Sequence, residues 1–415
     1  MERISEVRVL TTKRLVATVL GAQAVGALVQ VISGPLLSRL AGPYPFGVFA
    51  PVLSVAAIGR LVAESGLTFH VLSAKDLSEE EAHDLHGRSV KLSIFVALIG
   101  GLVAALIGSV TVDERVFRGM ASALLIVFTG VGAVPIAWIQ RNGGLGKLAW
   151  LSVGLSAAST ALAIPLALLG FNLAAVVSNN ILPMTVLPVY TWWISGLYKA
   201  GKTTSDLTAG FRWGTLGASA AYFLSSGADG IALATYLDPT TLGVYTRIVL
   251  LASLPGQVIA TGLASVGQLA MSTRVAHGAQ LRYLVKASGL TLAVFSIPLA
   301  LSMAGLNLPV ILFGSKYYVT PLAYEYFTVA SALFFVGSLF NTFHQANRRT
   351  AQQTAPLLVH SAIAIGGILV FRPTSIERIG LILLIASAVR SVLLGVVSWR
   401  DIIGKPRSIE EPAPV

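Results

Sequence analysis

Long apolar segments alternate with short polar stretches along almost the whole chain. A helix needs about 20 apolar residues to cross the hydrocarbon core of a bilayer, and reading the segments at that length gives about twelve helices. The pattern therefore predicts an all-α integral membrane protein. We expect the spanning helices near residues 15–37, 46–68, 90–111, 119–140, 149–169, 172–194, 214–237, 242–268, 284–305, 321–343, 354–371 and 379–399.

Composition agrees with a membrane chain, since 55% of the 415 residues are apolar and 11% are charged, against roughly 25% charged residues in soluble domains. With both termini placed in the cytoplasm, most lysines and arginines lie in the N-terminal segment, the even-numbered loops and the tail, as the positive-inside rule requires. The net charge of +11 thus reflects topology and attraction to anionic lipids. We expect a multi-pass protein of the cytoplasmic membrane with no nucleic-acid partner. The basic residues on the external side are Arg39, Arg115, Arg118, Lys316, Arg372 and Arg378.

One short motif occurs twice, at nearly half the length of the chain. "LAGPYPFGVF" at residues 40–49 and "YLDPTTLGVY" at residues 236–245 each follow an apolar segment. Both contain a proline, three further residues, Gly-Val and an aromatic residue. We interpret the match as an internal duplication, with lobes at residues 1–200 and 201–415. Because six helices per lobe is an even number, the lobes are parallel repeats, an arrangement found in secondary transporters.

The shared residues are Pro43 and Gly47 in the first copy and Pro239 and Gly243 in the second. Proline fixes its own φ angle, and glycine tolerates positive φ. We therefore expect each pair to close a tight turn on the external side. A further break in the eighth span, Pro255-Gly256, predicts a hinge.

Charged residues inside the predicted spans provide the candidate site. Each costs at least about 2.5 to 3.5 kcal/mol near the bilayer centre, so such groups usually face a partner or a wet cavity. We assign them, with two glutamines of the first span, to a substrate cavity between the lobes. The set is Arg60, Glu64, Asp229, Arg247, Arg390, Gln23 and Gln30.

Each assignment has a structural alternative. Arg60 and Glu64 are four residues apart on one helix face and suit an i,i+4 ion pair. Asp229 suits either a hydrogen bond that fastens two helices or a coupling-ion site. Arg247 lies about one turn from the external end, within reach of the surface, and Arg390 suits pairing within its own lobe. The glutamines are equally typical of hydrogen bonds between helices.

Catalytic and metal-binding motifs are missing from the sequence. No P-loop, H-E-x-x-H or G-x-S-x-G pattern occurs, and there is no cysteine for a disulfide or thiolate site. His83 and His86 lie in a polar stretch that we interpret as a cytoplasmic helix, with a capping box at Ser78 and Glu81, and not as a metal site. We expect no cofactor and no enzyme activity.

Two stretches resemble a known family. "GAQAVGALVQVISGPLLSRLAGPYPFGVFAPVLSVAAIGRLVAESGL" and "ADGIALATYLDPTTLGVYTR" are similar to the first and seventh-to-eighth helix regions of bacterial Wzx-like polysaccharide flippases. These belong to the multidrug/oligosaccharidyl-lipid/polysaccharide exporter superfamily. A basic residue commonly follows the aspartate there, whereas this chain has Gly230. The matching positions are Ser38-Arg39, Gly42-Pro43, Phe46-Gly47, Phe49, Gly66-Leu67, Asp229, Gly243 and Tyr245.

The resemblance implies a 12-helix fold of two six-helix lobes, with a V-shaped cavity lined mainly by helices 1, 2, 7 and 8. It also implies transport of undecaprenyl-pyrophosphate-linked oligosaccharide for surface polysaccharide biosynthesis, alongside other polysaccharide assembly proteins. The cationic side chains of Arg60 and Arg247, with Arg390 as a further candidate, would attract a pyrophosphate in a low-dielectric cavity.

Three other functions stay open. A cation-coupled multidrug exporter of the same superfamily would carry more acidic than basic residues in its cavity. A membrane glycosyltransferase or polymerase subunit would need catalytic signatures or a large external loop. A scaffold of a polysaccharide assembly complex is the third. The sequence does not specify the sugar, the coupling ion or the oligomeric state.

Overall fold

The computed structural model describes residues 2–64, 67–73, 77–108, 110–197, 213–272, 277–346 and 350–403, and the regular elements in these ranges are all helices. The N-terminal half comprises α1 Glu2–Ala41, α2 Pro43–Glu64, α3 Leu67–Ser73, α4 Glu79–Leu106, α5 Val112–Ile139, the π-helical turn η1 Gln140–Gly144, α6 Leu145–Leu168 and α7 Asn172–Ser195. The C-terminal half comprises α8 Trp213–Ala234, α9 Pro239–Ser272, α10 His277–Met303, α11 Leu308–Phe313, the 3₁₀ turn η2 Ser315–Tyr317, α12 Pro321–Ala346, α13 Thr350–Phe371 and α14 Ile376–Ile403.

Each predicted spanning segment centres on one long helix of the structure, and the segment at 46–68 runs past the end of α2 at Glu64 into α3. By length and hydropathy, nine stretches of the described chain qualify as candidate membrane spans, and one of them, Val112–Leu168, runs across α5 and α6. The all-α membrane fold is confirmed, while the count of twelve spans stays a prediction.

Local sequence explains where several helices begin. Pro43, Pro239 and Pro321 are the first residues of α2, α9 and α12, a position where the missing N–H costs nothing. At the start of α5, Thr111 and Glu114 form a capping box with each other's backbone N–H groups.

The helix contacts of the N-terminal half recur in the C-terminal half. In the first, α2 packs on α4 and α5, α5 on α4 and α7, and α6 on α1 and α7. In the second, α9 packs on α10 and α12, α12 on α10 and α14, and α13 on α8 and α14. The two sets correspond helix by helix, as parallel repeats require. The boundary predicted between residues 200 and 201 lies outside the described residues, so the domain division stays a proposal.

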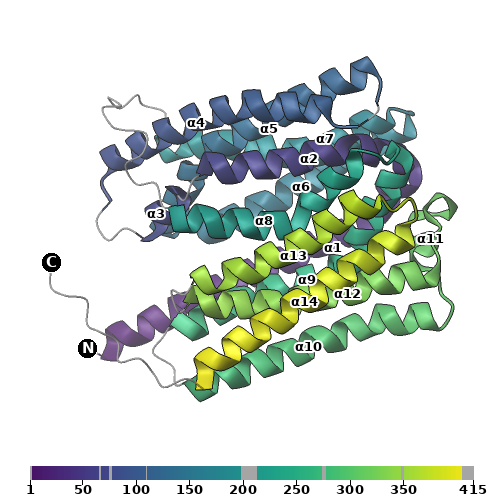
Figure 1. Ribbon diagram of the computed structural model, residues 1–415. Helices are drawn as coiled ribbons and strands as arrows, with labels where there is room; N and C mark the ends of the chain where they lie inside the picture. The colour runs from purple at the N-terminus through teal and green to yellow at the C-terminus, as the bar shows by residue number, and fades with distance from the viewer. Residues whose placement is uncertain are drawn as a thin grey trace.

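The bundle has two distinct ends. The α1–α2 and α8–α9 turns lie at the same end as α11, which we call the hairpin end (Figure 1). The start of α1 and the end of α14 lie at the opposite end, which we call the terminal end (Figure 1). Both described ends of the chain are therefore on one side of the bundle.

The halves share a buried core toward the hairpin end. The largest cluster of buried apolar residues combines Phe46 and Phe49 of α2 with Leu242 and Tyr245 of α9, among many others. Toward the terminal end, two smaller clusters each belong to one half. The N-terminal cluster comprises Leu67, Val71, Ala82, Leu85, Val134, Ala137 and Leu197, and the C-terminal cluster comprises Leu284, Ala287, Leu339 and Phe343.

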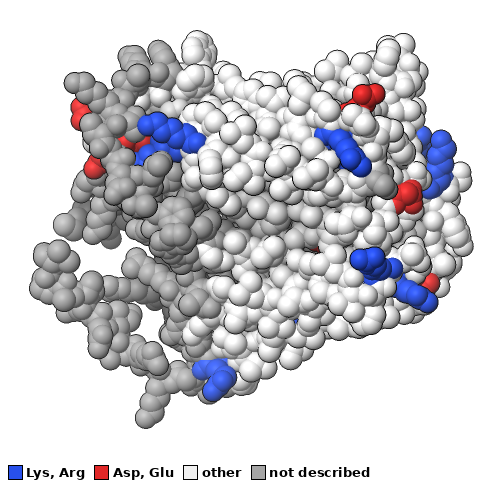
Figure 2. Space-filling view, turned by 45° about the horizontal axis from the view of Figure 1, so that its top comes forward, with Lys and Arg blue, Asp and Glu red and all other residues white. Residues whose placement is uncertain are grey.

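The outer surface has the character of a lipid-facing surface. On the face in Figure 2, charged side chains gather toward the ends, and the middle is almost free of them. Large apolar side chains are exposed along α4, including Leu98, Leu102 and Leu106. Such contiguous exposure suits a bilayer.

Candidate functional site: the contact between the two hairpins

The repeated Pro and Gly residues touch each other across the two halves. A Cβ atom built on Gly47 would fall far inside 3.0 Å of the backbone oxygen of Pro239 and 2.9 Å from the backbone nitrogen of Gly243. Reciprocally, a Cβ built on Gly243 would fall far inside 3.0 Å of the backbone oxygen of Pro43. Only glycine fits at either position. We call these four residues, Pro43, Gly47, Pro239 and Gly243, the hairpin contact.

The predicted role of the two glycines as turn residues is wrong. Gly47 and Gly243 lie inside α2 and α9, and the residue with positive φ in the first turn is Gly42, at φ 74°. Residues four apart lie on one helix face, so the spacing places a proline carbonyl and a bare glycine side by side. The repeat therefore serves the approach of two helices.

The turn of the second copy is capped by an aspartate. The carboxylate of Asp238 accepts the backbone N–H of Thr240 at 2.8 Å and that of Thr241 at 3.1 Å. A hydrogen bond from the side chain of Thr241, followed by these backbone bonds, lowers the pKa of Asp238. This cap fixes the start of α9 next to the hairpin contact.

Polar bonds join the halves around the hairpin contact. Arg39, at the end of α1, donates from Nε to the backbone oxygen of Leu312 at 2.8 Å and from Nη2 to that of Ile311. The hydroxyl of Tyr317 donates to the backbone oxygen of Ser38 at 3.3 Å. These three bonds tie the end of α1 to the segment that includes α11 and η2.

Arg247 of α9 also bridges the halves. Its guanidinium carbon lies 3.7 Å from the ring centroid of Phe46 on α2, a cation–π contact. The side chain is half-buried, and its buried Nε makes no hydrogen bond among the described residues. Arg247 thus contacts the other half through Phe46, and its assignment to a substrate cavity stays a prediction.

Asp229 fastens two helices of the C-terminal half. The hydroxyl of Tyr245 on α9 donates to the carboxylate of Asp229 on α8, and the Tyr245 ring packs edge-on against Phe327 at 5.8 Å. Asp229 precedes the last residue of α8 by five positions, about 7 Å along the axis. It therefore lies near the hairpin end, and the structure agrees with the alternative of a hydrogen bond that fastens two helices.

Arg390 lies inside the C-terminal half. It is fully buried, and it donates to the backbone oxygen of Phe334 at 3.1 Å and to the hydroxyl of Ser338 at 3.3 Å. Its guanidinium carbon lies 4.0 Å from the Phe334 ring centroid. These partners are all on α12, so the structure agrees with the alternative of partners within one lobe and does not bring Arg390 to the hairpin contact.

The remaining candidates lie away from the hairpin contact. The exposed side chain of Arg60 is four residues before the end of α2, about 25 Å from Pro43 along the axis. Gln30 of α1 is also exposed. The side chains of Gln23 and Glu64 lie outside what the structure describes, so the Arg60–Glu64 pair stays a prediction.

The predicted hinge lies within a continuous helix, because α9 runs through both Pro255 and Gly256. A Cβ on Gly256 would collide with the ring of Phe335 on α12. Gly256 therefore serves close packing in this state, and its role as a hinge stays a prediction.

Arg118 is a residue that the sequence analysis missed. It was counted as an external basic residue, yet its side chain is 2% exposed and binds backbone oxygens of α2 and of the end of α4. An arginine two turns into a helix carries no sequence signal for such partners.

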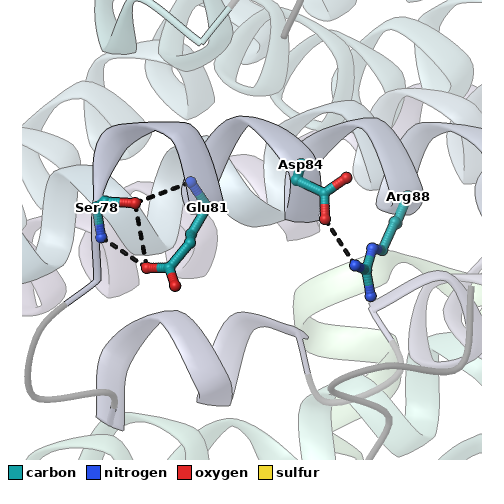
Figure 3. A network of polar contacts seen from close by, with 4 residues as sticks. All are labelled: Ser78, Glu81, Asp84 and Arg88. Carbon is teal, nitrogen blue, oxygen red and sulfur yellow. Dashed lines mark hydrogen bonds and ion pairs between the residues drawn. The ribbon is translucent and has the colours of Figure 1, made fainter. Parts of the chain in front are cut away.

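The predicted capping box of the cytoplasmic-side helix is confirmed. Ser78 accepts the backbone N–H of Glu81 at 3.1 Å, and the Glu81 carboxylate accepts the backbone N–H of Ser78 at 2.9 Å (Figure 3). One turn further on, Asp84 and Arg88 form an ion pair of 2.6 Å (Figure 3). In the part of the chain that the structure describes, no group of three or more His, Cys, Asp or Glu residues is arranged to hold a metal.

A family model described as "Polysaccharide biosynthesis protein" matches residues 36–320, more than half of the chain. The chain belongs to this family. Succinoglycan biosynthesis transport protein ExoT of Rhizobium meliloti (strain 1021) is 23% identical over 252 residues, covering 57% of this chain and 49% of that protein. The chain thus spans about half the length of this curated relative.

Two solved structures share the fold. One is the lipid II flippase MurJ in an inward closed conformation, with a TM-score of 0.69 and 14% identity over 92% of this chain and 86% of that one. The other is an inward-facing multidrug resistance MATE family transporter of the MOP superfamily, with a TM-score of 0.63 and 15% identity over 93% of this chain and 98% of that one. The chain therefore has the fold of these transporters.

The region matched to the polysaccharide biosynthesis family begins at residue 36 and ends at residue 320. It includes the hairpin contact and the partners of Arg39 and Tyr317, whereas Arg390 and Gln30 lie outside it. The family match thus covers both hairpins that form the contact.

Proposed function

We propose that this protein is a flippase that moves an undecaprenyl-pyrophosphate-linked oligosaccharide across the cytoplasmic membrane for surface polysaccharide biosynthesis. In this proposal the hairpin end faces outward, both termini lie in the cytoplasm, and the protein alternates between opening the hairpin end and opening the terminal end. The observation that carries the proposal is the reciprocal hairpin contact, which joins the halves at the hairpin end of a transporter fold.

The contact is suited to opening and closing. It brings bare backbone against bare backbone at Gly47 and Gly243, and the side chains that bridge the halves around it, Arg39, Arg247 and Tyr317, would release their partners when the halves separate. At the terminal end, the buried cluster of each half is complete without the other half. We propose that the two halves rock as rigid bodies about the core that they share at the hairpin end.

The positive side chains suit an anionic headgroup. Arg60 is exposed toward the terminal end of α2, and Arg247 lies between the halves near the hairpin end. Guanidinium groups bind phosphate oxygens well, and a low dielectric strengthens that attraction. We propose that a pyrophosphate enters at Arg60 and moves toward Arg247 while the lipid tail stays in the bilayer.

The test is translocation of a lipid-pyrophosphate-linked oligosaccharide in reconstituted vesicles at equal folded protein. We expect Arg60→Ala to reduce the rate by about tenfold, as loss of one charge-assisted contact predicts. The matched control is Arg115→Ala, which removes an exposed arginine of α5 and should leave the rate unchanged.

Two results would contradict the proposal. Wild-type vesicles that export small organic cations and move no lipid-linked glycan would identify a drug exporter. Equal transport rates for wild type and Arg60→Ala would show that Arg60 is not the entry site for the pyrophosphate.

A further inference from the structure

Arg118 of α5 holds two separate parts of the N-terminal half. Its Nε donates to the backbone oxygen of Val48 at 2.9 Å, and its Nη2 to that of Gly47 at 3.5 Å. Its Nη1 donates to the backbone oxygen of Ile107, just beyond the last residue of α4, at 2.8 Å. One buried side chain thus connects α2, α5 and the α4–α5 loop.

Gly47 needs an outside donor because of Pro51. In an α-helix the carbonyl of one residue accepts the N–H of the residue four positions later. Proline has no N–H, and its ring crowds that carbonyl. The backbone oxygen of Gly47 therefore lacks its helical partner, and Arg118 is the side chain that reaches it.

Both parts held by Arg118 touch the C-terminal half. Gly47 belongs to the hairpin contact. Gly108, which follows Ile107, has a φ of +78°, and a Cβ on it would lie 2.5 Å from the backbone oxygen of Ala234 at the end of α8. Arg118 therefore lies directly behind two surfaces that meet the other half.

A second bond ties the same helices together. The hydroxyl of Tyr44 on α2 donates to the carboxylate of Glu114 on α5, one turn before Arg118. Two interactions thus join the starts of α2 and α5, the Tyr44–Glu114 hydrogen bond and the bonds from Arg118. Of these side chains, Arg118 is the buried one.

We propose that Arg118 is a positioning residue for the hairpin contact. By replacing the hydrogen bond that Pro51 removes, it keeps the first turns of α2 and the α4–α5 loop in the geometry that closes the hairpin end. The inference rests on the proposed alternation of the two ends, and it is independent of which substrate is carried.

The test is the labelling rate of a buried cysteine by a membrane-impermeant maleimide. The chain has no cysteine of its own, so Leu242→Cys, at a position 1% exposed in the shared core, reports opening of the hairpin end. Thr240→Cys, at an exposed position of the same helix, controls for reagent access. Each variant is measured without substrate, at equal folded protein, so failure of the lipid-glycan assay would leave this test intact.

We expect Arg118→Met to raise the labelling rate of Leu242→Cys by about tenfold, the effect of losing one hydrogen bond to a charged group. Arg115→Met should not change it. Pro51→Ala restores an N–H to the carbonyl of Gly47 but not the bonds to Val48 and Ile107, so adding it to Arg118→Met should lower the rate part of the way to wild type. The labelling rate of the Arg118→Lys variant should lie between those of wild type and Arg118→Met.

An unchanged rate in folded Arg118→Met would overturn the proposal. So would an increase that Pro51→Ala does not reduce, because Arg118 would then serve only general packing. If Arg118→Met does not fold, the yield of the Arg118→Met/Pro51→Ala double variant decides. Recovered folded protein supports the proposal, and no recovery overturns it.

Discussion

The α1–α2 and α8–α9 hairpins present the same Pro and Gly to each other but are held in place differently. In the N-terminal half, Arg118 donates to the carbonyls of α2 from a neighbouring helix. In the C-terminal half, Tyr245 donates to Asp229, which joins α9 to its own hairpin partner α8. The two hairpins therefore share the residues of the hairpin contact and differ in the hydrogen bonds that hold α2 and α9 in place.

This difference separates two physical requirements. The contact itself demands a bare backbone at matched positions of both helices, because a single Cβ on either side would force the halves apart. The hydrogen bonds behind the contact need only keep the first turns of α2 and α9 in place, and any buried hydrogen bond can do this. Substitutions in the contact should therefore affect opening more than substitutions in the fasteners.

The largest effect is expected from a side chain in the contact. Gly47→Val or Gly243→Val should weaken the closed hairpin end by about 3 kcal/mol, the upper range for overpacking. Labelling of Leu242→Cys should rise by about two orders of magnitude. The control is Gly289→Val on α10, where an added Cβ meets nothing within 4 Å. Equal labelling in all three variants would contradict the claim that the contact requires glycine at these two positions.

A smaller effect is expected from the C-terminal fastener. Asp229→Leu leaves the buried hydroxyl of Tyr245 without its acceptor and should cost about 1 to 3 kcal/mol of stability. Asp229→Asn keeps an acceptor oxygen and should cost less. Thermal unfolding in detergent measures both, and Tyr245→Phe in the Asp229→Leu background should add little. Additive losses would show that the two residues act separately.

Arg390→Met should have a weaker effect still, although Arg390 is as deeply buried as Arg118. The backbone oxygen of Phe334 also accepts the hydroxyl of Ser338 at 2.9 Å, so it keeps a partner when Arg390 is removed. Replacing a buried charge by an apolar side chain of similar length is often neutral. We expect an unchanged labelling rate of Leu242→Cys and less than about 1 kcal/mol of lost stability. A large rise in labelling would show that Arg390 also supports the hairpin end.

The smallest effect on opening is expected at the terminal end. Ser78→Ala removes the cap of α4 and should destabilise its first turn by about 1 kcal/mol, seen as faster amide exchange at Glu81. Labelling at Leu242→Cys should not change. The matched variant Thr111→Ala removes the cap of α5, whose Glu114 binds Tyr44, and should raise labelling slightly. Equal effects of the two variants would contradict the distinction between the ends.

Much of the fold could be predicted because bilayer thickness fixes helix length and leaves a plain apolar pattern. The repeat and the Ser78–Glu81 capping box were also visible, since both are local in sequence. The reciprocal role of Gly47 and Gly243 was not, because it depends on which helices meet in space. The bond between Asp229 and Tyr245 was open in the sequence, because it depends on how α8 packs against α9.

The partners of the buried arginines were likewise beyond the sequence. Arg118 and Arg390 bind backbone oxygens. Because every residue carries a backbone oxygen, the sequence does not indicate which one a buried arginine binds. Pro51 offered the one usable signal, since a proline inside a helix frees the carbonyl four residues earlier. Only the packing of α5 on α2 tells which donor reaches it.

The central claim is that the hairpin contact opens when substrate moves. Spin labels on Asp113→Cys and Thr240→Cys, exposed positions at the hairpin end of opposite halves, would give the distance distribution between the halves by pulsed electron paramagnetic resonance. The account predicts a short distance alone, a longer population with lipid-linked oligosaccharide, and the longer population without substrate in Gly243→Val. One unchanged distribution under all three conditions would contradict it.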